Sequence, residues 1–508
     1  MPEYLRALAV VVCLSVPTLW LLQKPITEAA IALDDYRIRR NTWIGLTLLS
    51  FLANNFWIYV GVAALVLIVV GAKDSHRLGL YLFVLFVVPP FWQEVPGFGL
   101  VNYFVEMTHA RLLALTVLLP AYLQLRARDD TPSFGSLWVD RFLLGYIMLQ
   151  IALQGLVDTA TNTLRFAFYS FVDVFLPYYV ASRSMRSPEA CRDALGSLLV
   201  AALVMAPLAA FEYLKHWLLY SPLAGTLGAR FGMGNYLSRG DDLRALTSTG
   251  HSIILGYVMA IAIAFFGYTQ AFLSSRRVAG ALLCALLVGL YAPVSRGPWT
   301  GAAAGAAVML LTGPNRLSRL GKIAVLGVPV AIGLAFSPMG QKFIDLLPFV
   351  GTVDDSTVVY RQRLFEVSVQ VMMLHPWLGS FDYLSAPAMQ EMIQGEGIID
   401  MVNTYLSVAM SYGLVGLSLF ASVFVFAAVA VLRGIWQHEA GSEMRYLGRA
   451  LLAALVSALI TIATVSSILI VPTVYWMLAG LCSGYGVLAT RARPVPHVAH
   501  LSVGGRAA

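Results

Sequence analysis

Three arginines occupy polar segments between the long apolar runs of this sequence. Arg296 lies in the segment Ser295-Arg296-Gly297 between two apolar runs, and Arg361 and Arg363 lie two residues apart in a longer polar interval. A guanidinium group is planar, and its fork of N–H donors matches two oxygens of a phosphate group, which the ammonium of lysine does not. These residues therefore indicate binding of a diphosphate group. The alternatives are an interfacial structural arginine at Arg296 and solvated loop charges at Arg361 and Arg363.

The composition identifies the elements that must position these arginines. Hydrophobic residues make up 59% of the 508 residues, charged residues make up 12%, and the mean hydropathy is +0.75, whereas soluble domains carry about 25% charged residues. Apolar stretches recur that are long enough for a ~30 Å hydrocarbon core. They lack the alternation of barrel strands, and in lipid only helices or closed barrels satisfy the backbone. The sequence therefore predicts an all-α polytopic membrane bundle of about 12 to 15 spans.

The apolar runs divide the chain into one membrane domain and a tail. Residues 1–490 are predicted to form a single polytopic domain, which includes an extracytoplasmic catalytic loop at 338–411, and 491–508 a basic cytoplasmic tail. The run 43–71 is either one long tilted helix or a re-entrant piece broken at Asn54-Asn55. The predicted spans lie near residues 6–22, 43–71, 78–92, 111–125, 141–157, 165–182, 194–216, 249–273, 279–294, 298–313, 323–337, 412–432, 448–468 and 471–490.

Basic residues are unevenly distributed between alternate loops. One set of loops holds 19 Lys and Arg in 75 residues, and the other set holds 9 in 125. Because basic residues accumulate in cytoplasmic loops, the first set is predicted to be cytoplasmic and the second to face outward. The same bias explains the net charge of +7 without nucleic acid. The basic-rich loops are 73–77, 126–141, 183–192, 276–277, 316–322, 433–449 and 491–508, and the basic-poor loops are 94–111, 158–165, 216–248, 295–297 and 338–400.

The polar interval from about residue 354 to 417 resembles the O-antigen ligase and O-antigen polymerase superfamily of bacterial envelope glycosyltransferases. Its members carry an arginine, an aromatic residue four positions on, a PxxG corner and a later HN-x-x-L … G-x-x-G segment. An SR-G step also matches at Ser295–Gly297, and the resemblance covers residues 240–432. One position departs, because Val402 stands where the ligase pattern has histidine. The matching residues are Arg361, Phe365, Pro376, Gly379, Asn403, Leu406, Gly413 and Gly416.

This resemblance implies a fold, a donor and a set of site residues. The fold is an all-helical bundle with a large outward loop of short helices. The donor is a glycan on undecaprenyl diphosphate at the outer face of the bacterial inner membrane, and a second glycan or lipid is the acceptor. The implied partners are membrane lipid and a chain-length regulator or flippase. The resemblance implies Arg296 and Arg361 as catalytic residues and Arg244 and Asn403 as substrate-binding residues. Residues near them add Asp400 as a predicted catalytic residue, and His251, Arg363 and Tyr405 as predicted substrate-binding residues.

No cofactor and no metal are predicted for this chemistry. A diphosphate is a good leaving group once its charge is neutralised, and two arginines supply that electrostatic effect without a metal. No disulfide is predicted either, because the cysteines lack metal-type spacing and most lie in apolar runs. The four cysteines are Cys13, Cys191, Cys284 and Cys482.

The acceptor hydroxyl benefits from a general base within hydrogen-bond reach. With Val402 at the family histidine position, Asp400 is the nearest candidate, and Glu396, His251 and His375 are alternatives. Asp400 could equally be the N-cap of a helix that begins near Met401.

Two further polar groups have structural explanations. Arg244 binds substrate or belongs to the polar start of a helix, with Ser248 or Thr249 as its N-cap. Glu212 and Lys215 stand three residues apart in an apolar run, and this spacing favours an ion pair on one helix face.

Three functions fit these residues. The vacant histidine position, with an acid and Asn403-Thr404-Tyr405-Leu406 nearby, favours a polymerase that joins polysaccharide repeat units. The alternative is an O-antigen ligase that transfers the glycan to lipid A-core or another acceptor. A more distant alternative is a transporter or flippase, which predicts paired repeats and broken spans near the membrane centre. No such repeat is evident in the sequence.

Overall fold

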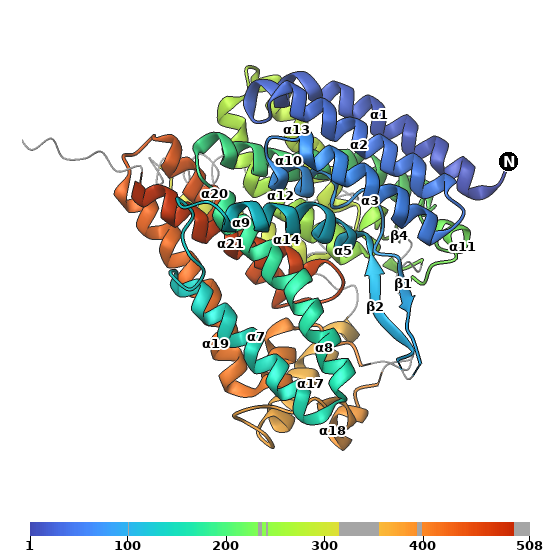
Figure 1. Ribbon diagram of the computed structural model, residues 1–508, viewed down its shortest axis with the longest axis vertical. Helices are drawn as coiled ribbons and strands as arrows, with labels where there is room; N and C mark the ends of the chain where they lie inside the picture. The colour runs from blue at the N-terminus through green and yellow to red at the C-terminus, as the bar shows by residue number, and fades with distance from the viewer. Residues whose placement is uncertain (100, 232–235, 240–241, 314–354, 394–398, 492–508) are drawn as a thin grey trace, which may run out of the picture.

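Helices make up nearly all of the regular structure in the computed structural model of this chain (Figure 1). The structure describes residues 1–99, 101–231, 236–239, 242–313, 355–393 and 399–491. The helices before residue 252 are α1 (Glu3–Ala29), α2 (Leu33–Leu52), α3 (Phe56–Lys73), α4 (Arg77–Val84), α5 (His109–Leu113), α6 (Leu119–Arg126), α7 (Trp138–Val157), α8 (Ala160–Tyr169), α9 (Leu176–Ser184), α10 (Pro188–Lys215) and α11 (Leu223–Leu227).

The second half of the chain is also helical. Its helices are α12 (Ser252–Thr269), α13 (Arg276–Tyr291), α14 (Arg296–Leu311), α17 (Asp355–Met372), α18 (Pro387–Gln390), α19 (Thr404–Gln437), α20 (Glu443–Ile462) and α21 (Val471–Arg491). Single π or 3₁₀ turns are η1 (Ala114–Leu118), η2 (Ser170–Phe175), η3 (Thr247–Thr249), η4 (Gln270–Phe272) and η5 (Tyr383–Ser385). Two antiparallel hairpins pair β1 (Trp92–Pro96) with β2 (Tyr103–Thr108), and β3 (Ser238–Arg239) with β4 (Asp242–Leu243).

Within the described residues, eight helices are long and apolar enough to cross a membrane. They are α1, α3, α7, α10, α12 with η4, α19, α20 and α21. This confirms the predicted all-α polytopic membrane fold. Other predicted spans fall on shorter helices: α13 and α14 have 16 residues each, and the span predicted at 78–92 contains only the 8-residue α4. The predicted span at 323–337 and nearly all of the basic tail lie outside the described residues.

The apolar stretch 43–71 is broken at Asn54-Asn55, so it is not one long helix. It forms two full helices, α2 and α3, and not the re-entrant piece that was the other interpretation. Asn54 has a left-handed backbone (φ 50°), and Asn55 caps α3 by accepting hydrogen bonds from the N–H groups of Trp57 (2.8 Å) and Ile58 (3.2 Å). Helices α2 and α3 then pack against each other. Asparagine tolerates left-handed backbone and is a strong N-cap, so this pair ends one helix and begins the next.

A ridge of glycines fixes α14 against α20. An added Cβ at Gly297 would lie 2.3 Å from Thr464 Oγ1, and one at Gly301 would lie 2.1 Å from Thr461 Oγ1. A Cβ added at Gly305, one turn further on, would lie 3.0 Å from the Ala453 carbonyl oxygen of α20. Small residues at every fourth position let two membrane helices approach closely, and the approach holds them by van der Waals packing. The N-terminus of α14 is thereby fixed beside the C-terminal end of α20.

The predicted PxxG corner inserts into a break in α19. Gly413 interrupts the helix with φ 64° and ψ −168°, and Gly379 in the corner has φ 68°. The corner replaces the helical hydrogen bonds that the break removes. Leu414 N donates to the Pro376 carbonyl (2.8 Å), and Ser380 N donates to the Met410 carbonyl (2.8 Å). Both glycines are needed for backbone conformation and for space, since a Cβ on either would contact the other segment at 2.2–2.4 Å.

The loop that contains α17 and α18 has a small hydrophobic core of its own beside this break. In Figure 1, α17 and α18 lie at the lower end of the molecule, next to the ends of α7, α8 and α19. The loop core joins α17, α18 and the start of α19, and Val402 packs against it. Its buried members are Leu364, Val367, Val371, Met389, Met392, Met401 and Met410.

We predict that Gly413→Ala destabilises the protein. The backbone at Gly413 lies in a region essentially restricted to glycine, and occupying it with another residue costs about 1–3 kcal/mol; the contact with the Trp377 carbonyl adds to this. The apparent Tm of detergent-purified protein measures the effect. Gly280→Ala on α13 is the control, since a Cβ there meets nothing within 4 Å. Equal Tm values for the two variants would contradict the interlock between corner and break.

Candidate active site

Arg296 is the first residue of α14. The segment just before α12, which contains Arg239 and Arg244, contacts the residues that immediately precede Arg296. Val294 has a left-handed backbone (φ 47°), which is rare for a β-branched residue and is found mostly where surrounding contacts enforce it. Those contacts come from two arginines. Arg239 Nη1 donates to the Val294 carbonyl (2.9 Å), and Arg244 Nε donates to the Pro293 carbonyl (3.2 Å). The predicted residue Arg244 therefore lies against the segment that positions Arg296.

Glu212, at the C-terminal end of α10, holds this outward segment in place. Its fully buried carboxylate accepts hydrogen bonds from the backbone N–H groups of Leu219 (2.9 Å), Leu246 (2.9 Å) and Thr247 (2.8 Å). The predicted ion pair between Glu212 and Lys215 is therefore wrong. A buried carboxylate needs several hydrogen-bond donors, and the three backbone groups supply them without a counter-ion.

His251 caps α12, so the prediction of Ser248 or Thr249 as its N-cap is wrong. His251 Nδ1 accepts a hydrogen bond from the N–H of Ile253 (3.2 Å). Burial, and after it the positive charge of Arg244, lower the pKa of His251 to about 4. The imidazole is therefore neutral at neutral pH, which suits an acceptor in a cap, but its low pKa makes it a weak base and its Nδ1 is already used by the cap.

Arg361 lies on α17 with one donor unsatisfied. Its Nε is buried and has no hydrogen-bond partner among the described residues. Burial lowers the pKa of Arg361, the carboxylate of Asp400 opposes this effect, and the charge of Arg296 lowers the pKa further. The charges of Asp400 and Arg296 are thus both close enough to act on Arg361. Guanidinium groups stay protonated in proteins, so two like charges lie here beside a buried N–H that has no partner among the described residues, a combination that favours an anion.

Asp400 presents its carboxylate at the surface of this cluster. Its Oδ1 lies 3.1 Å from the hydroxyl of Ser466, and its carbonyl oxygen accepts a hydrogen bond from Tyr360 Oη (3.2 Å). The alternative prediction, that Asp400 caps the following helix, is wrong. That helix begins at Thr404, and Asn403 is the cap.

Ser466 was missed by the sequence reasoning, which placed it in a span at 448–468. Helix α20 ends at Ile462, and the connection to α21 carries Thr464 against Gly297 and Ser466 against Asp400. Three small hydroxyl residues within four positions could have marked this connection. They are Thr464, Ser466 and Ser467. Because one connection touches both Gly297 and Asp400, it sets the position of Asp400 relative to Arg296.

The remaining predicted substrate-binding residues have structural partners. Arg363 forms an exposed ion pair with Glu391 (3.0 Å), and lies two residues from Arg361, which places the two on different faces of the helix. Asn403 Oδ1 accepts from Tyr405 N (2.9 Å) and Leu406 N (3.2 Å). Tyr405 Oη donates to the Leu459 carbonyl (3.0 Å). Their contacts with substrate stay predictions.

A pocket of about 230 Å³ opens beside the Pro376–Gly379 corner, on the loop that follows α17. Hydroxyl, carboxylate and imidazole groups line it, and such groups form hydrogen bonds with sugar hydroxyls. His375, which sequence reasoning treated only as a minor candidate base, is one of them. The polar lining residues are His375, Ser380, Asp382, Tyr383 and Ser385.

The fold is that of a multi-pass membrane protein, and Arg361 lies near the charges of Arg296 and Asp400 beside a loop of short helices. Residues 281–421 match the protein family described as O-Antigen ligase. This match confirms the predicted resemblance to the O-antigen ligase and polymerase superfamily, and it supports a glycosyltransferase-like enzyme of that type. It spans Arg296, Arg361 and Asp400. No curated protein matches the chain.

We predict that Arg361→Lys strongly reduces glycan product at normal protein level, whereas Arg363→Lys has a small effect. Lysine keeps the charge but loses the planar fork that binds two phosphate oxygens. Arg363 provides a matched control, because it lies on the same helix in an exposed ion pair, and such pairs contribute only about 0–1 kcal/mol. Product is measured as glycan formed per amount of protein in membranes. Near-normal product from Arg361→Lys would exclude Arg361 as the anion ligand.

Proposed function

We propose that this protein is a polysaccharide repeat-unit polymerase for an exopolysaccharide, capsule or O-antigen. It transfers a glycan from an undecaprenyl-diphosphate donor to a growing glycan at the outer face of the bacterial inner membrane. No metal and no nucleotide sugar take part in the proposed reaction. A chain-length regulator or a flippase is the proposed partner.

The observation that carries this proposal is the buried, unpaired Nε of Arg361 beside the charges of Arg296 and Asp400. In the proposed reaction, the acceptor oxygen forms a bond to the anomeric carbon of the donor, and the bond from that carbon to the diphosphate breaks. The negative charge of the leaving diphosphate is bound by Arg296 and Arg361. Their positive charges stabilise the transition state most strongly where water is excluded. Asp400 accepts the proton of the acceptor hydroxyl.

The proposed outward orientation rests on the distribution of charge. The basic-poor set of loops contains the Arg244 segment, Arg296 and the α17 loop, whereas the basic-rich loops lie at the other helix ends. A lipid-linked donor whose diphosphate lies at the membrane surface would meet Arg296 at the start of α14. Its sugars would extend toward the pocket beside the corner. In this arrangement the lipid carrier stays in the bilayer while the glycan is transferred outside it.

The proposal of a polymerase rather than a ligase rests on Val402. Because this position holds valine, it contributes no imidazole. In the described structure the Val402 side chain packs against the hydrophobic core of the α17–α18 loop. Deletion of the gene tests the choice. A polymerase deletion leaves single repeat units on the lipid carrier, which is the expected result. Long lipid-linked chains would indicate a ligase, and repeat units that face the cytoplasm would indicate a flippase.

We predict that Asp400→Asn lowers the transfer rate ~10²–10⁴-fold, the usual effect of removing a general base. Because Asn403 and not Asp400 caps α19, the apparent Tm should change little. Glu366→Gln, an exposed carboxylate on α17, is the control and should keep normal activity. Radiolabelled repeat units supplied to membranes give the rate.

The double variant Asp400→Asn with Val402→His tests the vacant histidine position. Recovery of transfer would show that imidazole at this place can replace the carboxylate. Full activity in Asp400→Asn alone would exclude Asp400 as the base. The base would then be Glu396, which lies outside the described residues, or a group of the substrate.

A further inference from the structure

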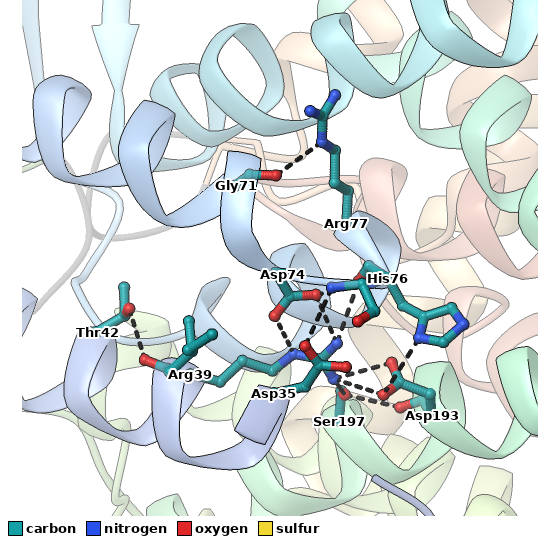
Figure 2. Close-up of polar contacts among 11 residues, drawn as sticks. Asp35, Arg39, Thr42, Gly71, Asp74, His76, Arg77, Asp193 and Ser197 are labelled. Atoms are coloured by element: carbon teal, nitrogen blue, oxygen red, sulfur yellow. Dashed lines mark hydrogen bonds and ion pairs between the residues drawn. The ribbon is translucent and has the colours of Figure 1, made fainter. Parts of the chain in front are cut away.

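A second cluster of charged residues lies at the N-terminal end of α10. Arg39 of α2 is fully buried there, and Figure 2 shows its guanidinium between two aspartates. Arg39 Nε and Nη2 each donate to Asp74 at 2.8 Å, and Nη1 donates to the two carboxylate oxygens of Asp193 at 2.8 and 2.9 Å. A third aspartate, Asp35, lies one helical turn before Arg39 and accepts a hydrogen bond from Ser75 N (3.0 Å).

The charges of this cluster do not balance. Asp35, Asp74 and Asp193 are only 3%, 7% and 3% exposed, and among the described residues Arg39 is the one buried cation that pairs with them. Three carboxylates and one guanidinium leave a formal charge of −2 with neutral His76. Arg77 is directed away from the cluster in Figure 2, and its Nε donates to the Gly71 carbonyl. Buried charges must be paired or bound to a metal, so this cluster requires additional positive charge.

Three side chains of the cluster are arranged as metal ligands. Asp35, His76 and Asp193 each offer one ligand atom, and these three atoms lie within 4.8 Å of one another. Asp35 Oδ2 and His76 Nδ1 are buried and have no hydrogen-bond partner in the part of the chain that the structure describes. His76 Nδ1 lies 4.0 Å from Asp193 Oδ2, a separation that one ion with two bonds of about 2.1 Å spans.

We propose that Asp35, His76 and Asp193 bind one divalent metal ion of the Zn²⁺ or Mn²⁺ class, with water in the remaining positions. Two carboxylates and one imidazole suit these ions better than Mg²⁺, which prefers oxygen ligands alone. A charge of +2 balances the cluster. Arg39 acts as an outer partner that orients the Asp193 carboxylate, a role that such partners have in metal sites generally. The His76 side chain is 41% exposed and gives the ion access from solvent.

The proposed ion adds a second link between three parts of the fold that the hydrogen bonds of Arg39 already join. Asp35 comes from α2, His76 from the turn between α3 and α4, and Asp193 from α10. Gly79 makes this approach possible, since an added Cβ would lie 1.9 Å from Asp193 Oδ1. Along α10, 19 residues separate Asp193 from Glu212, or ~28 Å of helix. The ion is thus a structural clamp far from the candidate active site, and it is independent of the proposed function.

Metal binding by the purified full-length chain tests the proposal. The chain carries no histidine tag, is treated with EDTA, and is then titrated separately with Zn²⁺, Mn²⁺ and Mg²⁺. We expect about one equivalent of Zn²⁺ or Mn²⁺ by elemental analysis and a higher apparent Tm with that ion than with Mg²⁺. Asp35→Asn and His76→Gln should each weaken binding on the order of tenfold or more. The control Asp34→Asn removes the neighbouring exposed carboxylate, which pairs with Arg37, and should bind normally.

Two results would overturn the proposal. The first is binding of neither Zn²⁺ nor Mn²⁺ by the wild-type chain, with no rise in Tm, which would show that no such ion occupies the cluster. The second is equal binding by the wild type, Asp35→Asn and His76→Gln, which would place the ion elsewhere. If Asp35→Asn does not fold, metal binding by His76→Gln becomes the test. His76 is partly exposed, and the change to glutamine removes a ligand without burying a new charge.

Discussion

The contact between the Pro376–Gly379 corner and the break at Gly413 is the constraint on which the candidate active site depends. A membrane helix cannot leave backbone groups unpaired in lipid, so a break in α19 requires another segment to pair with it. The corner supplies Pro376 and Trp377 carbonyls to Leu414 and Val415, and Ser380 N to Met410. The start of α19 is in turn fixed to the α20–α21 connection by Thr404, whose hydroxyl donates to the Val465 carbonyl (2.8 Å). The glycine ridge then fixes α14 to α20, and Arg296 is the first residue of α14.

The arginines of this chain show how partners decide what one residue type does. Arg39 has all of its nitrogens bound to carboxylate, hydroxyl or carbonyl groups, so it holds helices together. Arg363 faces solvent with Glu391 and contributes little. Arg361 is mostly buried with a free Nε among the described residues and with Arg296 nearby. Of these three arginines, only Arg361 combines burial, an unused donor and a like charge, which is the combination that attracts an external anion.

The sequence predicted the membrane bundle, because hydropathy is a local property of the chain. Motif spacing selected Arg296 and Arg361, whose charges lie close together in the structure, while their role stays a prediction. The sequence-based prediction failed where a partner distant in sequence decides the outcome. Glu212 was paired with Lys215 three residues away, whereas its donors include Leu246 and Thr247, 34 and 35 residues away. Ser466 was placed inside a span because hydropathy does not report where a helix ends. Asp400 was allowed as a cap because aspartate and asparagine cap equally well, and only the structure selects Asn403.

The two ends of α10 show two ways of burying a carboxylate at a membrane boundary. Glu212 is satisfied by three backbone N–H groups, whose dipoles need no counter-ion and which fix a loop in one conformation. Asp193 shares one guanidinium with Asp74, and Asp35 lies beside them with an oxygen that finds no partner in the described chain. The first arrangement is complete in the folded chain and needs nothing further. The second is complete only with added positive charge, so the stability of this end depends on what the surrounding solution supplies, whereas the geometry of the candidate active site does not.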